Sequence, residues 1–241
     1  MRVILVTGAN GGLGQAIARS FLNESIENFL WLAVHKNKKA ATQLAEAFSD
    51  RCAVLNLNVA ERSDWEKAVR HILEKTQRID VLVNNAGQHQ DGLLANLDDA
   101  AWSGVLSINL DGVFYGCRAV LPAMISQRIG RIINVASLSA LLAPAGQANY
   151  AAAKAGVVAL TQSLAKEVAR IGITVNAVCP GYIETEALAG LSAEERRSAT
   201  SRVPMRRFGR PEEVASAVRF LACSEASYIT GSIIKVDGGI F

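Results

Sequence analysis

Seven short apolar runs, each bounded by polar or turn-forming residues, have the length and composition of strands buried in a parallel sheet. Six longer segments between them repeat their apolar residues every three to four positions, a spacing typical of helices that cover a sheet. The predicted strands are residues 3–6, 29–34, 53–57, 81–83, 132–135, 174–178 and 233–236. The predicted helices are residues 13–22, 39–48, 63–75, 102–125, 148–171 and 211–221.

Strands and helices alternate along most of the chain, which predicts a Rossmann-like α/β fold. We expect a doubly wound parallel sheet of seven strands between two layers of helices, hence three layers in all. No linker or repeat divides residues 1–241, so we expect one domain. Residues 184–209 interrupt the alternation and form a candidate substrate lid, with an ordinary surface helix and turn as the alternative.

Composition narrows the class of protein. Of 241 residues, 50% are hydrophobic and 20% are charged, which suits a globular protein with one large core. The formal charge of +3 comes from scattered basic residues, so nucleic acid is not an expected partner. No apolar run has membrane-spanning length, and the first residues lack the pattern of a secretion signal.

Cysteine and histidine positions do not indicate a metal or redox site. The four cysteines are far apart and indicate buried thiols in a reducing cytoplasm: Cys52, Cys117, Cys179 and Cys223. The three histidines share no ligand spacing, and of His35, His71 and His89 only His89 is a candidate for the substrate mouth. We therefore expect a cytoplasmic protein without a metal.

The first predicted strand ends in a glycine-rich turn, and a predicted helix follows directly. The turn reads Thr7-Gly8-Ala9-Asn10-Gly11-Gly12-Leu13-Gly14. Glycines at this point leave the backbone amides of a helix N-terminus open to a pyrophosphate. A simple tight turn is the alternative, but the strand and the helix supply the context that dinucleotide binding requires. No Gly-Lys-Ser/Thr follows, so a P-loop is excluded.

The residues after the second predicted strand indicate which dinucleotide binds. NAD-binding folds place an acidic residue there to hold the ribose 2′-hydroxyl. This chain has Lys36 and Asn37 instead, which can bind a 2′-phosphate by charge-assisted hydrogen bonds. The pattern favours NADP(H), with a solvated helix start as the alternative.

A candidate catalytic group follows the fifth predicted strand. Tyr150 and Lys154 are four residues apart and share one face of a helix. A neighbouring cation can bring a phenol, which ordinarily ionises near pH 10, into use near neutrality. Ser137 lies just beyond residues 132–135, at the sheet edge where this architecture binds ligands, and its hydroxyl can hold a carbonyl oxygen.

Four motifs in this order and spacing resemble those of the short-chain dehydrogenase/reductase family. They are Gly8-x-x-x-Gly12-x-Gly14, Asn84-Asn85-Ala86-Gly87, Ser137 thirteen residues before Tyr150-x-x-x-Lys154, and Pro180-Gly181. Residues 91–94, 146–150, 180–185 and 228–231 are similar to bacterial 3-oxoacyl-(acyl-carrier-protein) reductases. The sequence departs from those reductases at Gly11, where they commonly carry arginine, and at Gln88-His89-Gln90, which indicates a different substrate mouth.

The resemblance implies a role for each matching residue. Tyr150 would be the general acid/base, and Ser137 would hold the carbonyl oxygen. Lys154 would bind the ribose and lower the pKa of Tyr150, and Asn109 would anchor a water relay to this lysine. Gln147 would join Ser137 and Tyr150 at the substrate. The implied cofactor residues are Gly8, Asn10, Gly11, Gly12, Leu13 and Gly14 at the pyrophosphate, Asn58 and Val59 at the adenine, Asn85, Ala86 and Gly87 at the ribose side, and Pro180, Gly181, Ile183 and Thr185 toward the nicotinamide.

The resemblance further implies NADPH-dependent reduction of a 3-oxoacyl thioester carried on acyl-carrier protein. One alternative is a ketoreductase or hydroxy dehydrogenase for a polyketide, a secondary metabolite or a small-molecule ketone. A remote alternative is a non-catalytic nucleotide sensor or scaffold on the same fold. The predicted helix at residues 148–171 is apolar beyond the face that one sheet can cover, which predicts a homo-oligomer, and the resemblance implies a homotetramer.

Overall fold

A computed structural model describes residues 1–241, apart from the side chain of Ala187. All seven predicted strands form, and they pair in parallel in the order β3-β2-β1-β4-β5-β6-β7. The predicted doubly wound sheet is therefore confirmed. The strands are β1 Arg2–Thr7, β2 Asn28–Val34, β3 Cys52–Asn56, β4 Val81–Asn84, β5 Gly130–Val135, β6 Ile173–Pro180 and β7 Ile233–Val236.

The winding of the chain reverses at β1, which pairs with β2 on one side and with β4 on the other. Crossovers on the two sides of β1 leave in opposite directions, so the loops at the carboxyl ends of β1 and β4 separate and leave a crevice. The glycine turn follows β1 directly, which places it in this crevice.

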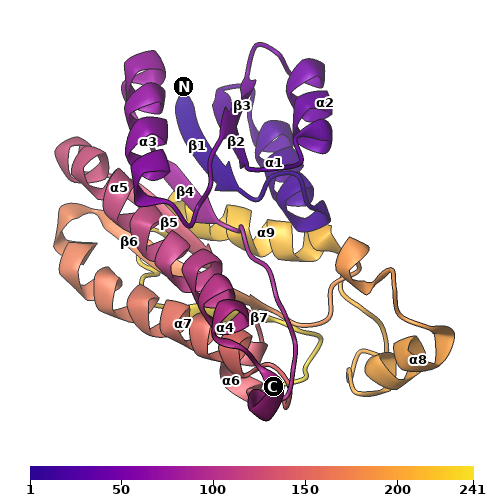
Figure 1. The fold of residues 1–241 in the computed structure, drawn as a ribbon. Helices are drawn as coiled ribbons and strands as arrows, with labels where there is room; N and C mark the ends of the chain where they lie inside the picture. Colours follow the sequence, from indigo (N-terminus) through magenta and orange to yellow (C-terminus); the bar gives the residue numbers. More distant parts are fainter.

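Two layers of helices enclose the sheet (Figure 1). One face is covered by α1 Gly12–Glu24, α2 Lys39–Ala47 and α9 Pro211–Ala222, and the other by α3 Arg62–Thr76, α5 Gly112–Gln127 and α7 Ala148–Val168. Successive residues of a strand point to opposite faces. Accordingly, Ile4 and Val6 pack with α1 and α9, whereas Val3 and Leu5 pack with the helices of the opposite face. The predicted three-layer arrangement is confirmed.

The predicted helix at residues 102–125 is not continuous. It consists of α4 Asp99–Leu106, the π-helical turn η2 Ser107–Asp111 and α5. A π turn widens the helix by one residue and is common at functional sites. Here it carries Asn109, whose side-chain amide donates to the carbonyl of Val105, so this side chain takes part in the widened turn. The apolar periodicity alone does not reveal the break.

Residues 184–209 contain two elements that the apolar pattern did not resolve: η4 Glu186–Leu188 and α8 Ala193–Ser201. Ser192 and Glu195 form a capping box at the start of α8, but α8 buries no residue. Figure 1 shows α8 standing away from the two helix layers. Another short helix, α6 Ser139–Leu142, follows Ser137 and was also not predicted.

None of the helices described is long and apolar enough to cross a bilayer. Within the same residues, no three His, Cys, Asp or Glu side chains gather as a metal-binding group would.

Candidate active site

A cleft of about 440 Å³ lies at the carboxyl edge of the sheet, and segments far apart in the sequence line it. It brings together fourteen of the predicted cofactor and catalytic residues: Gly8, Asn10, Gly11, Gly12, Leu13, Gly14, Asn85, Ala86, Gly87, Ser137, Tyr150, Lys154, Pro180 and Gly181. Ile183 and Thr185 line it as well. The other predicted residues, which are Lys36, Asn37, Asn58, Val59, Asn109 and Gln147, lie outside its lining.

The glycine turn is held against the turn that follows β4. The hydroxyl of Thr7 accepts from the backbone amides of Asn85 and Ala86 at 3.0 Å each. The side-chain amide of Asn85 donates to the carbonyl of Thr7 at 2.9 Å. Gly8 has φ = 64°, and a Cβ there would lie 2.8 Å from the Cα of Ala86. Only glycine fits this position. The close packing of Gly8 against Ala86 therefore requires a residue without a side chain, which leaves the backbone of the turn open.

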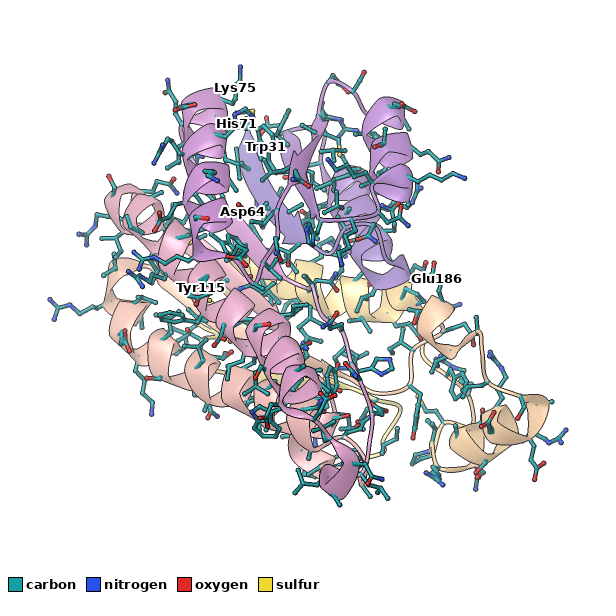
Figure 2. All side chains as sticks on the ribbon, in the orientation of Figure 1. Trp31, Asp64, His71, Lys75, Tyr115 and Glu186 are labelled. Carbon is teal, nitrogen blue, oxygen red and sulfur yellow. The ribbon has the colours of Figure 1, made fainter. Side chains whose placement is uncertain are left out.

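A carboxylate of the chain itself lies at this turn. Glu186 Oε2 accepts from the backbone amide of Gly12 at 3.2 Å, at the first residue of α1. Figure 2 labels Glu186 beside this end of α1. Helix N-termini bind anions because their amides are free and the helix dipole is positive there. The turn therefore fits the pyrophosphate of a dinucleotide, and Glu186 is a resident anion at the same amide.

The candidate adenine side lies beyond the cleft lining. Lys36 is exposed two residues after β2 ends, and the side-chain oxygen of Asn37 accepts from the amide of Lys39. Asn58 uses its side-chain oxygen to accept from the amide of Ala60. The Val59 carbonyl accepts from the Trp65 indole at 3.0 Å. These contacts fix the loops after β2 and β3, while the Lys36 ammonium remains available to a ligand.

Ser137 and Tyr150 meet in the cleft. The Ser137 hydroxyl accepts from the amide of Ser139 at 3.1 Å, and it is hydrogen-bonded to the Tyr150 phenol. Burial raises the pKa of Tyr150 above its ordinary value, and the bond to Ser137 only partly opposes this shift. Burial is the largest cause of this shift, and the predicted lowering of the Tyr150 pKa by Lys154 stays a prediction. The phenol is held in its protonated form at neutral pH.

Lys154 lies on the same face of α7 as Tyr150, as the four-residue spacing predicts. Its ammonium is 5.7 Å from the centre of the Tyr150 ring and donates to the Val135 carbonyl at 2.8 Å. The side chain is almost fully buried, and burial lowers the pKa of Lys154 to about 8. Burying a cation without a nearby carboxylate partner lowers the stability of the folded protein. Such unfavourable burial is typical of functional sites.

Asn109, in the π turn η2, lies close to Lys154 and joins Ser137, Tyr150 and Lys154 in the candidate catalytic group. Its amide donates to the carbonyls of Gln88 at 2.6 Å and Val105 at 2.8 Å, whereas its buried Oδ1 has no partner among the described residues. A Cβ on Gly87 would lie 2.8 Å from Asn109 Oδ1 and 3.6 Å from Lys154 Nζ, so these groups border one small space. An unpaired buried acceptor beside a buried ammonium suits an ordered water between them.

Gln147 lies beside the cleft rather than in it. Its amide donates to Asp91 at 2.8 Å, and its oxygen accepts from the Ser139 hydroxyl at 2.8 Å. The structure thus gives Gln147 two protein partners, through which it connects the loop after β4 to the turn after β5. Its predicted substrate contact stays a prediction.

Several residues that shape the site were not predicted from the sequence. Asn149 donates to the carbonyls of Gln90 and Ala101, and Asn134 donates to Thr161 behind the catalytic face. Both asparagines are fully buried. A polar residue inside or beside a predicted buried element is the signal that marks them, since buried polar groups need partners. No comparable signal marks Glu186, because a carboxylate in a surface loop is ordinary.

The fold and this constellation define a class of protein, and comparisons with known proteins agree. The family model described as "Enoyl-(Acyl carrier protein) reductase" matches residues 8–240. The chain belongs to the short-chain dehydrogenase/reductase family. It is accordingly an oxidoreductase that uses a nicotinamide dinucleotide.

Bacterial relatives are similar over their whole length. The 3-oxoacyl-[acyl-carrier-protein] reductase FabG of Thermotoga maritima is 42% identical over 239 residues, covering 99% of this chain and 97% of the relative. The proteins of the same name from Vibrio cholerae and Escherichia coli are 41% and 39% identical, each over 240 residues, covering 100% of this chain and 97% of the relative.

Proposed function

We propose that this protein reduces the 3-oxo group of an acyl thioester to the 3-hydroxyl with NADPH, and that acyl-carrier protein carries the substrate. The observation that carries this proposal is the placement of Ser137, Tyr150, Lys154 and Asn109 around a cleft that also contains the glycine turn. The names of the full-length relatives support the substrate class.

The site residues divide the chemistry among them. The hydroxyls of Ser137 and Tyr150 hydrogen-bond the oxygen of the 3-oxo group, and the nicotinamide supplies the hydride when bound. Tyr150 then gives its proton to the new alkoxide, which is a stronger base than the phenolate that remains. Lys154 stabilises the resulting phenolate, and the space beside Asn109 Oδ1 offers a route for a water that returns the proton.

The choice of NADPH over NADH rests on the end of β2. The residues after β2 include Lys36 and no carboxylate that would repel a 2′-phosphate. Because Gly11 supplies no charge, Lys36 is the principal cation that we assign to this phosphate.

Replacing Lys36 with alanine should lower kcat/KM for NADPH about tenfold and leave the value for NADH nearly unchanged, since a charge-assisted hydrogen bond is lost only with the phosphorylated ribose. Initial rates with the two cofactors measure this effect. Lys67→Ala on the exposed face of α3 is the matched control. An equal loss with both cofactors would contradict the assignment of the phosphate to Lys36.

Replacing Glu186 with alanine should tighten NADPH binding about fivefold, because the variant no longer supplies a competing anion to the amide of Gly12. Isothermal titration with the protein alone measures the dissociation constant without turnover. Glu194→Ala in α8 removes a similar charge away from the turn and should have no effect. Unchanged affinity in Glu186→Ala would show that the pyrophosphate does not displace this carboxylate.

Three further features belong to the proposal. Residues 184–209 act as a lid within a single domain, supported by the weak attachment of α8 and the contact of Glu186 with the glycine turn. The protein forms a homotetramer, supported by the exposed Phe114 of α5 and Ala155 of α7. It works in the cytoplasm, where its unpaired cysteines stay reduced.

The experiment that tests the substrate class is a panel of 3-oxoacyl thioesters against monoketones of similar size, with NADPH. We expect kcat/KM to be higher for the thioesters than for the monoketones, and the product to be the 3-hydroxyacyl thioester. Turnover of the monoketones with none of the thioesters would assign the site to another carbonyl substrate.

A further inference from the structure

The mouth of the cleft carries one ring whose presence the proton transfer does not explain. His89 lines the cleft with Ser137 and Tyr150, and its ring lies edge-on to the Tyr150 ring with 6.2 Å between centroids. More than half of its side chain is exposed. The imidazole is therefore a solvent-exposed ring at the edge of the cleft that contains the catalytic hydroxyls.

The backbone on both sides of His89 is fixed by hydrogen bonds. The Gln88 carbonyl accepts from Asn109, the Gln90 carbonyl accepts from Asn149, and the Gly92 amide donates to the Gly146 carbonyl. Two of these partners belong to the catalytic π turn and to the start of α7. The loop thus holds the position of His89 relative to Tyr150 before any substrate arrives.

The ring lies next to the carboxylate of Asp91. His89 Nδ1 lies 3.3 Å from Asp91 Oδ1, and Asp91 Oδ2 accepts from Gln147 at 2.8 Å. A neutral imidazole that donates from Nδ1 has its lone pair on Nε2, so Nε2 is a hydrogen-bond acceptor. With Nδ1 beside the carboxylate, Nε2 is the ring nitrogen farther from Asp91, which we assign to a ligand in the cleft.

We propose that His89 is a specificity-determining residue whose Nε2 accepts a hydrogen bond from the amide N–H that follows the sulfur in a pantetheine-type thioester. This inference rests on the proposed function. The reacting carbonyl lies at Ser137 and Tyr150, and the thioester and its amide extend from it toward the mouth, past the His89 ring. A substrate without this amide gains nothing from His89.

Two acetoacetyl thioesters separate this contact from the chemistry. The N-acetylcysteamine thioester carries the amide, and the S-ethyl thioester has the same reacting end without it. In His89→Ala and His89→Phe, the ratio of kcat/KM for the amide-bearing thioester to that for the S-ethyl thioester should fall about fivefold, the effect of one lost hydrogen bond. In His89→Gln, whose side chain retains an acceptor, the ratio should stay within about twofold of the wild-type value.

Gln90→Ala is the matched control, because it changes the neighbouring side chain and keeps the carbonyl that binds Asn149. NADPH affinity should be unchanged in every variant, which reports that the fold and the cofactor site persist. A wild-type ratio in His89→Ala would overturn the role of His89. Absence of turnover of either thioester by the wild-type protein would instead overturn the proposed function, so the two failures are distinguishable.

Discussion

Tyr150→Phe should lower kcat about a thousandfold, because the substitution removes the group that donates the proton and leaves its aromatic ring in place. NADPH affinity should stay within about twofold of the wild-type value, since the Phe ring still fills the space between Lys154 and His89. Single-turnover kinetics and equilibrium titration measure the two quantities separately.

Ser139→Ala is a useful comparison for Tyr150→Phe. It removes a nearby hydroxyl that bonds to Gln147 but keeps the backbone amide that donates to Ser137. This variant should retain most of its kcat. Turnover close to the wild-type rate in Tyr150→Phe would show that another group supplies the proton.

Lys154→Met should abolish most activity and also stabilise the protein at neutral pH. The pKa of Lys154 is about 8 in the folded protein, against an ordinary value of 10.5. Below pH 8 both the folded and the unfolded chain carry the charge, and burying it costs roughly 3 kcal/mol. Methionine avoids that cost but loses the hydrogen bond to the Val135 carbonyl, which lowers stability by about 1 kcal/mol. The free energy of unfolding should therefore rise by about 2 kcal/mol in the variant.

The pH dependence of Lys154→Met follows from the same values. Between pH 8 and 10.5 the unfolded chain binds more protons at this position, so wild-type stability rises with pH and the advantage of the variant shrinks. Above 10.5 the lysine is neutral in both states and the advantage is gone. Denaturant unfolding of both proteins across this range measures it. A constant difference in unfolding free energy would contradict a depressed Lys154 pKa.

The sheet could be predicted almost completely from the sequence, for a physical reason. Strands buried on both faces, such as β1 and β4, are predominantly apolar, so their composition reveals them. Helix boundaries around α4 and α5 could not be predicted in the same way, because the π turn adds only one residue within a long run of helical apolar spacing. The turn is nevertheless what places Asn109.

The candidate site also contains residues that the sequence could locate and contacts that it could not. Ser137, Tyr150, Lys154 and the glycines could be located because strict spacing and turn chemistry constrain them. The contact of Glu186 with Gly12 joins residues 174 positions apart, and no local pattern records it. Sequence spacing shows that Tyr150 and Lys154 share a helix face but not the burial of the phenol, which raises the pKa of Tyr150.

The most direct test of the central claim is the rate of NADPH oxidation with an acetoacetyl thioester, measured beside the same reaction with NADH. We expect one 3-hydroxybutyryl thioester per NADPH oxidised, with kcat/KM about tenfold or more higher for NADPH than for NADH. Tight NADPH binding without oxidation in the presence of the thioester would contradict it and would make this chain a nucleotide-binding protein without the proposed chemistry.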